Sequence, residues 1–504
     1  MVTARPIPSL RAAKIWSYSL TVGKQAITAI LSFALAAMLG PEAFGVIAMA
    51  LVFINFIQML QQQGLMPAII TRSELTALHK DTAFWMVCGA SAILTIAGVV
   101  IAPFWAGVNQ LPDLTPVIQV LALTIPLSSS VVVHEAILRR NLEFKRLAFR
   151  SWASVLAGGV AGIAGALLGW GLWALVAQQL VMTVVDVIVL WGVSQWRPRL
   201  RWNQDAAREL WSYSARSASS SLALFLGGRM DIVLGGAFFG PVVIGVYRMG
   251  QRVTELALDI TARGMQSVSL PALSEVQHDH AAFADRFRGM LRQSTSLSLP
   301  LLGTVAGVAP CIERFLGSEW RGMATAIVLL AIVQAIRSIS FLLGPALQAA
   351  GRPGTLSLLM WAFMGLNILG LVIASHGLDT DGALVQLCVA MIIATILGAA
   401  LMVLVSARCL HIGPKSLLSP CMPGLIAGLM AAGVSTLAYQ LVETMPWMIA
   451  GGIAGSLGLV TATMVVLGLN EPRRNRLRRR LASSHRSRIS ICSPTRDASS
   501  EDLD

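Results

Sequence analysis

Five charged residues in one apolar stretch of the chain are spaced for a single helix face. At relative positions 0, 4, 7, 11 and 15 stand Arg248, Arg252, Glu255, Asp259 and Arg263. These spacings place the side chains on one side of an α-helix. Guanidinium groups bind phosphate oxygens through paired hydrogen bonds, so one interpretation is a polar stripe that lines a cavity for a phosphate-bearing ligand. The alternative is that the charges pair within the helix and hold helices together.

Other apolar stretches also contain ionisable residues. Such a group near the bilayer centre costs about 2.5 to 3.5 kcal/mol on insertion scales, so it normally faces a wet cavity or a partner. Arg216 and Arg263 lie near the ends of their stretches, where they can reach the interface. The remaining cations, which we consider candidate ligands of an anionic group, are Lys24, Arg229, Arg248, Arg252 and Arg337.

Acidic residues at similar depth are candidates for coupling transport to protons or for counter-ions of nearby arginines. These acids are Asp186, Asp231, Glu255 and Asp259. We interpret Asp231 as a counter-ion, because Arg229 lies only two residues away.

Composition identifies the environment of these charges. Of 504 residues, 55% are apolar and 12% are charged, and the mean hydropathy is +0.70. With about 20 apolar residues for each span, we expect a polytopic all-α membrane protein rather than a soluble enzyme. Fourteen spans are expected, at about 16–39, 43–63, 83–106, 115–137, 151–169, 172–194, 212–239, 242–268, 294–313, 322–344, 354–374, 382–405, 417–442 and 446–468.

The positive charges predict the orientation. One set of alternating loops, with both termini, holds 29 of the 38 Lys and Arg residues, and the other set holds two. Because cytoplasmic loops collect Lys and Arg, we expect both termini in the cytoplasm of a bacterial cell. The net charge of +13 therefore lies in loops and in an Arg/Ser-rich tail, so we expect no nucleic-acid partner.

The chain repeats itself after about 195 to 200 residues. Each copy begins with Trp-Ser-Tyr-Ser, at 16–19 and 211–214, and continues to a Gly-Pro-x-x-x-Gly turn, at 40–45 and 240–245. Six spans separate the copies, so the repeat is parallel, with its axis along the membrane normal. We predict an N-terminal lobe at 1–205, a C-terminal lobe at 206–412, an additional helix pair at 413–470 and a disordered cytoplasmic tail at 471–504.

Motifs for catalysis and energy use are missing from the sequence. There is no H-E-x-x-H zinc motif and no G-x-x-x-x-G-K-S/T nucleotide loop. The expected outer loops are short, which leaves no room for an extracytoplasmic catalytic domain. A transporter without a cofactor fits this pattern better than an enzyme does.

The ordered set of motifs resembles the Wzx-type polysaccharide exporters of the multidrug/oligosaccharidyl-lipid/polysaccharide flippase superfamily, in the colanic-acid and exopolysaccharide exporter branch. The resemblance covers about residues 10–470. It rests on Leu39–Gly45 and the loop Arg139–Phe144, on Phe239-Gly240-Pro241 with Gly245-Val246-Tyr247, and on Leu270–Ser274.

The resemblance implies a pair of six-helix lobes that flips undecaprenyl-pyrophosphate-linked repeat units across the inner membrane by alternating access. It implies that a cationic central cavity receives the pyrophosphate. The partners it implies are this lipid-linked glycan, membrane lipid, and a polysaccharide polymerase with its co-polymerase. Two alternatives stay open at this point, which are a multidrug or cation antiporter of the same superfamily and a non-transporting scaffold of a glycan-assembly complex.

Overall fold

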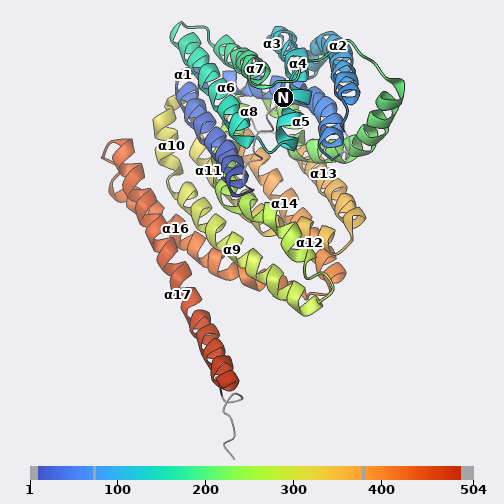
Figure 1. Cartoon of the computed structure of the whole chain (residues 1–504). Coiled ribbons are helices and arrows are strands. Elements are labelled where there is room, and N and C mark those ends of the chain that lie inside the picture. The colour runs from blue at the N-terminus through green and yellow to red at the C-terminus, as the bar shows by residue number, and fades with distance from the viewer. Residues whose placement is uncertain (1–9, 72–74, 377–381, 490–504) are drawn as a thin grey trace, which may run out of the picture.

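The computed structural model describes residues 10–71, 75–376 and 382–489, and all of its regular structure there is helical (Figure 1). In lipid a backbone has no water to bond with, so each span must satisfy its own N–H and C=O groups, as a helix does. Large apolar side chains cover the outside of the helices. Phe104, Leu358 and Ile373 are each at least 65% exposed, whereas Thr254 and Ser294 are fully buried. This is the distribution expected of a multi-pass membrane protein.

Two long helices, α1 (Leu10–Thr71) and α8 (Gln204–Ser274), are interrupted at the glycines of the repeated turns. Gly40 and Gly240 have φ of 71° and 80°, a conformation that glycine adopts without steric cost. In a straight helix, Asp231 and Tyr247 would be about 24 Å apart. The Tyr247 hydroxyl instead donates a hydrogen bond of 2.8 Å to Asp231. The two arms of α8 therefore fold back on each other at Gly240.

The remaining helices follow the order of the repeat. In the first half they are α2 (Ala77–Val108), α3 (Leu114–Ala122), α4 (Thr124–Ser129), α5 (Val132–Arg140), α6 (Phe144–Leu167) and α7 (Leu172–Val193). In the second half they are α9 (His280–Gly307), α10 (Ala309–Leu316), α11 (Met323–Ser340), α12 (Leu343–Ala349), α13 (Pro353–Ser375) and α14 (Ala383–Leu410), and a 3₁₀ turn, Ser318–Trp320, follows α10. Pro126 and Pro345 account for the breaks that precede α4 and α12, because proline clashes with the carbonyl four residues earlier.

The number of spans is compatible with the expected fourteen. In the described part of the chain, ten helices are long and apolar enough to cross a membrane, or up to twelve if each of two bent helix pairs is one span. Those ten include α1 and α8 once each, although each of these helices contains two of the expected spans. The all-α polytopic fold expected from the sequence is therefore confirmed.

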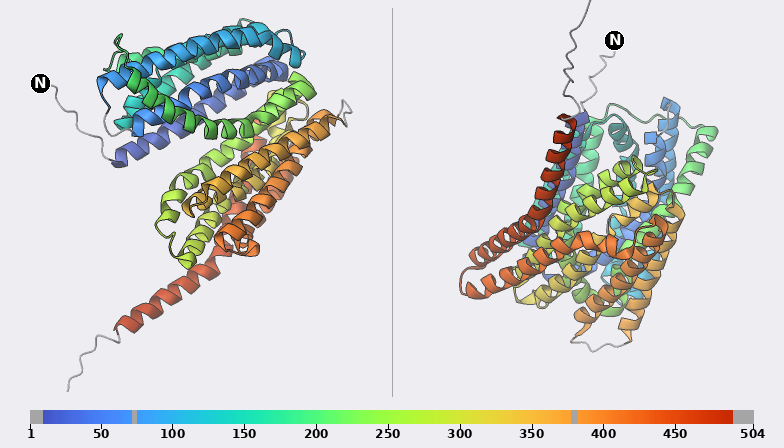
Figure 2. Two further views of the ribbon diagram at one scale, coloured as in Figure 1. Left: turned by 90° about the vertical axis from the view of Figure 1, so that its right-hand side faces the viewer. Right: turned by 90° about the horizontal axis from the view of Figure 1, so that it is seen from below.

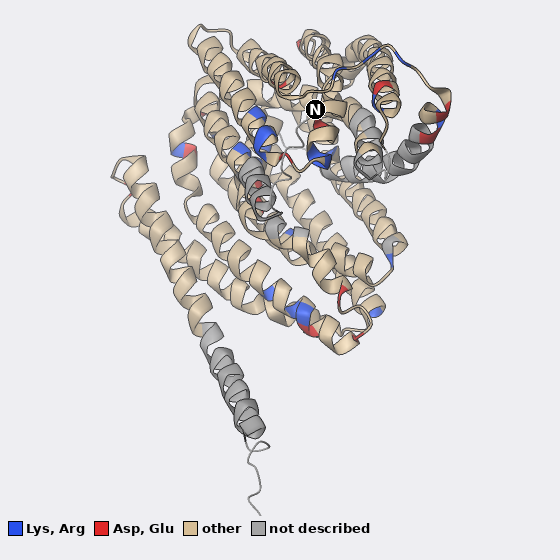
Figure 3. Cartoon of the chain, viewed as in Figure 1, with Lys and Arg blue, Asp and Glu red and all other residues tan. Residues whose placement is uncertain are grey.

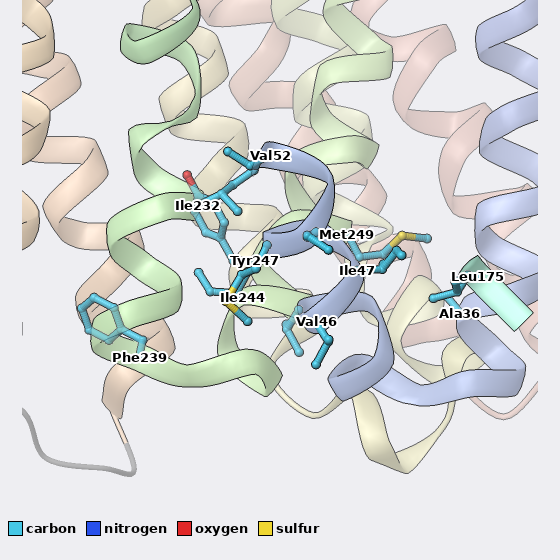
Figure 4. Close-up of a cluster of buried hydrophobic side chains, with 14 of the residues drawn as sticks. Ala36, Val46, Ile47, Val52, Leu175, Ile232, Phe239, Ile244, Tyr247 and Met249 are labelled. Atoms are coloured by element: carbon cyan, nitrogen blue, oxygen red, sulfur yellow. The ribbon is translucent and has the colours of Figure 1, made fainter. Parts of the chain in front are cut away.

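The two lobes meet at the repeated turns. Figure 2 shows the N-terminal helices and the helices from α9 to α14 as two groups, with α1 and α8 between them. A Cβ atom on Gly45 would lie 1.8 Å from the carbonyl oxygen of Pro241, and one on Gly245 would lie 1.8 Å from that of Pro41. Figure 4 shows that apolar side chains of both helices, among them Val46 of α1 and Ile244 of α8, belong to one buried cluster. The reciprocal contact is what a pseudo-twofold axis between two repeats produces.

The C-terminal elements pack on the second lobe. They are α15 (Pro414–Leu418), the 3₁₀ turn Ser419–Cys421, α16 (Met422–Leu441) and α17 (Trp447–Ile489). Gly303 of α9 and Gly428 of α16 allow close approach, because a Cβ on Gly303 would lie 2.1 Å from the Gly428 carbonyl oxygen. Helix α17 continues past residue 470, where we expected a domain boundary, and residues 490–504 of the expected tail lie outside the described residues.

Candidate functional site

The predicted polar stripe lies on the second arm of α8. Arg248 and Glu255 form an ion pair of 3.6 Å, and an Arg248 guanidinium N–H donates a hydrogen bond of 2.5 Å to the Gln251 side chain. The charged groups that surround Arg252 are Arg229, Arg248, Glu255 and Asp259. The stripe is therefore a mixed cluster of cations and acids on one helix face. The ion pair between Arg248 and Glu255 is expected under the alternative interpretation, in which the charges pair within the helix. The Arg263 side chain lies outside the described residues.

Arg252 differs from its neighbours in the stripe. Its side chain forms no ion pair or hydrogen bond with the described residues, and its Nε atom is buried without a partner. A buried N–H group without an acceptor is costly, since it loses its water without replacement. An anionic ligand would supply the missing acceptors.

Asp231, on the first arm of α8, has a different environment from the residues of the stripe. It is 5% exposed and accepts hydrogen bonds from Tyr247 (2.8 Å), from the Gln251 side chain (3.0 Å) and from the Ile232 backbone N–H (3.0 Å). The Tyr247 and Gln251 donors, which lie beyond Gly240, hold the two arms of α8 together. Sequence reasoning considered only neighbours along the chain and missed Tyr247 and Gln251, which the turn at Gly240 brings back to Asp231.

Asp259 connects the stripe to the other repeat. The Gln25 side-chain amide on α1 donates a hydrogen bond of 3.1 Å to the Asp259 carboxylate on α8. This contact joins residues 234 positions apart in the sequence, so it lies where the two lobes meet.

Lys24 and Asp186 belong to a second cluster, inside the N-terminal lobe. They line a cavity of about 550 Å³, here called the N-lobe cavity, between α1 and the helices from α3 to α7. Arg150 lies between two acids there, 2.8 Å from Glu135 and 3.1 Å from Asp186. Most of the membrane-spanning ribbon in Figure 3 is tan, so these few charged positions stand apart from their apolar surroundings.

Sequence reasoning missed Glu135, Arg139 and Arg150 in this cavity. It placed residues 138–150 in a cytoplasmic loop, whereas α6 begins at Phe144 and carries Arg150 into the lobe. One available signal was the spacing of Glu135 and Arg139, which form an ion pair of 2.7 Å one helical turn apart.

Arg337 lies in a third place. It lines a cavity of about 600 Å³ in the C-terminal lobe, here called the C-lobe cavity, between α8 and the helices from α11 to α14. Much of its lining is apolar and includes Phe341, Met360 and Phe363. The five expected cations are therefore distributed over three sites, with Arg229, Arg248 and Arg252 together on α8.

Comparison with known proteins gives a consistent result. A profile of the family described as "Polysaccharide biosynthesis protein" matches residues 34–325. The succinoglycan biosynthesis transport protein ExoT of Rhizobium meliloti (strain 1021) is 26% identical over 333 residues, which are 66% of this chain and 67% of that protein. The lipopolysaccharide biosynthesis protein WzxC of Escherichia coli (strain K12) is 23% identical over 341 residues, or 67% of this chain and 69% of WzxC.

A solved structure shares the fold. The lipid II flippase MurJ in an inward closed conformation superposes with a TM-score of 0.65 at 14% identity, over 91% of this chain and 99% of MurJ. At this identity the similarity establishes the arrangement of the helices. The predicted family resemblance is confirmed by the profile match and by the named relatives.

Proposed function

We propose that this chain, which belongs to the polysaccharide biosynthesis protein family, is a flippase for undecaprenyl-pyrophosphate-linked oligosaccharide repeat units. It would move these units across the bacterial inner membrane by alternating access, for exopolysaccharide or lipopolysaccharide synthesis, with both termini in the cytoplasm. Its relatives include a succinoglycan transport protein, and its fold is that of a lipid II flippase. Both support transport rather than catalysis.

One observation carries the proposal, which is the buried Nε–H of Arg252, without an acceptor among the described residues, beside Arg229 and Arg248. A pyrophosphate presents several oxygens that accept paired hydrogen bonds from guanidinium groups. Binding it would satisfy Arg252 and reduce the repulsion among the three arginines. The stripe lies beside the contact from Gln25 to Asp259, so a ligand bound there touches the junction of the two lobes.

The mechanism follows from this position. The headgroup enters between the lobes from the cytoplasmic side while the polyprenyl tail stays in the bilayer. Neutralised arginines permit closer approach of α1 and α8 on the inner side. The lobes then rock and separate at the reciprocal contact of Gly45 and Gly245, which lies on the outer side in the expected orientation.

Complementation of a deletion strain tests this proposal. We expect Arg248→Ala/Arg252→Ala to abolish polymer export and to leave lipid-linked repeat units on the cytoplasmic face, with normal protein abundance in the membrane. Arg286→Ala/Arg288→Ala is the matched control, because it removes two arginines from the ion pairs with Glu275 and Asp285 on the surface. Normal export by the α8 double variant would refute the role of the stripe.

A further inference from the structure

The two large cavities occupy equivalent places in the two repeats. The N-lobe cavity is lined by α1 and by helices from α3 to α7, and the C-lobe cavity by α8 and by helices from α11 to α14. Their volumes, about 550 and 600 Å³, are also similar. Both fall within the range of pockets that hold small-molecule ligands, about 300 to 1,000 Å³. The repeat has therefore produced two chambers of one size, and their chemistry can be compared directly.

The chambers differ in polarity. Phe341, Met360 and Phe363 line the C-lobe cavity, where Arg337 is the one charged residue among the described lining residues. The N-lobe cavity instead holds a network of ionised groups, with amide and hydroxyl side chains from four helices around it. Only the N-lobe cavity has the chemistry to hold a strongly hydrated ligand.

The charged residues that the structure describes in the N-lobe cavity leave one cation in excess. Arg139 and Arg150 are both held by acids, namely Glu135 (2.7 and 2.8 Å) and, for Arg150, also Asp186 (3.1 Å). Lys24 forms no ion pair with any described residue. Among the described lining residues two arginines and two acids balance, so the ammonium of Lys24 gives this part of the chamber one net positive charge.

The uncharged polar groups of the chamber suit a ligand with many hydroxyl groups. The side-chain amides of Asn55 and Gln179 line the cavity and make no hydrogen bond to the described residues. Each amide offers both donors and an acceptor, and a sugar hydroxyl likewise donates and accepts. The carboxylates of Glu135 and Asp186 have further lone pairs free for hydroxyl donors. A pyrophosphate fits less well, because the guanidinium groups here already have carboxylate partners.

We propose that the N-lobe cavity binds the glycan of the lipid-linked repeat unit and selects a sugar that carries one carboxylate. This inference rests on the proposed flippase function. Lys24 pairs with the sugar carboxylate, and the amides of Asn55 and Gln179 bind ring hydroxyls. The pyrophosphate occupies the stripe of α8. The two subsites adjoin each other at Gln25, which lines the cavity and donates a hydrogen bond to Asp259 of the stripe.

Two probes separate the subsites in the full-length chain held in lipid nanodiscs. One is the glycan released by mild acid from the repeat unit of the strain that carries this chain, which lacks the pyrophosphate. The other is inorganic pyrophosphate. We expect Lys24→Gln to weaken glycan binding at least tenfold and to leave pyrophosphate binding unchanged, and Arg252→Gln to do the reverse. Lys145→Gln removes an exposed cation outside the cavity and should alter neither affinity.

A third probe tests the carboxylate. Reducing the glycan carboxylates to alcohols should lower its affinity for the wild type to the level that Lys24→Gln shows with the untreated glycan. The reduced glycan should bind the wild type and Lys24→Gln equally.

The outcomes distinguish this inference from the function on which it rests. If pyrophosphate binds and the glycan does not, or if Lys24→Gln weakens pyrophosphate instead, the glycan subsite is refuted and the flippase proposal stands. An uncharged repeat unit, or equal affinity for the reduced glycan, refutes the selection of an acidic sugar. If the wild type binds neither probe, both proposals fail.

Discussion

With both termini in the cytoplasm, as proposed, the contact between the repeated turns lies on the outer side. It predicts that closure of that side depends on two glycines. A Cβ on Gly245 would lie 1.8 Å from the Pro41 carbonyl oxygen, and real Cβ contacts essentially never fall below 3.0 Å. Because both partners here are backbone, no side chain can rotate away. Gly245→Val therefore forces the two helices apart, and the same holds for Gly45→Val against Pro241.

The size of the effect follows from the cost of overpacking. Inserting a larger side chain into a packed contact costs about 1 to 3 kcal/mol. If that cost falls on the outward-closed state alone, its population relative to open states drops by about 5- to 150-fold. The two glycines share one contact, so the double variant should not show the sum of two independent effects.

Distances between spin labels at the outer ends of the lobes measure this shift. Suitable labels are cysteines at Leu168, after α6, and His376, after α13, in a background without the six native cysteines. We expect Gly245→Val to increase the population with long distances and to slow export. Gly433→Val is the control, because nothing lies within 4 Å of a Cβ at that exposed glycine of α16. Unchanged distances in Gly245→Val, or an equal change in Gly433→Val, would refute the reasoning.

Two further predictions concern stability, measured as thermal unfolding of the purified protein. Trp320 is 1% exposed and its indole N–H donates a hydrogen bond of 3.0 Å to the Ala36 carbonyl, so Trp320→Ala should cost about 3 to 5 kcal/mol. Trp320→Phe should retain most of the packing and lose much less stability than Trp320→Ala. Equal losses of stability in the two variants would contradict this account. Arg150→Ala should cost about 3 to 5 kcal/mol, because Glu135 and Asp186 lose a buried partner. Adding Glu135→Gln should recover part of that loss, and a further decrease would argue against charge burial as the cause.

Hydropathy and the repeat predicted most of the fold, because a membrane span is recognised from the residues of its own segment. A span must be long and apolar and must satisfy its own backbone, so its length and composition can be read along the chain. The turns at Gly40 and Gly240 were predicted from their equal spacing, and both glycines have positive φ. Their contact with each other was not predicted, because it joins residues about 200 positions apart.

The same distinction applies to the candidate site. Helical spacing alone predicted that Arg248, Arg252, Glu255 and Asp259 would share a face, and these residues are neighbours in the structure. Arg150 was assigned to a loop, because a charged residue at the start of a helix cannot be told from a loop residue by hydropathy.

The sequence by itself determined the membrane class, the helical repeat and the face of α8 that carries charge. Each of these is visible as a pattern within short segments of the chain, and the repeat is the recurrence of such a pattern. Tertiary structure alone decided that Lys24, Arg252 and Arg337 lie in three different places, and that two equivalent cavities differ in polarity. The reason is physical, since the partners of a charge at membrane depth come from other helices, and helix packing fixes which of them are within reach.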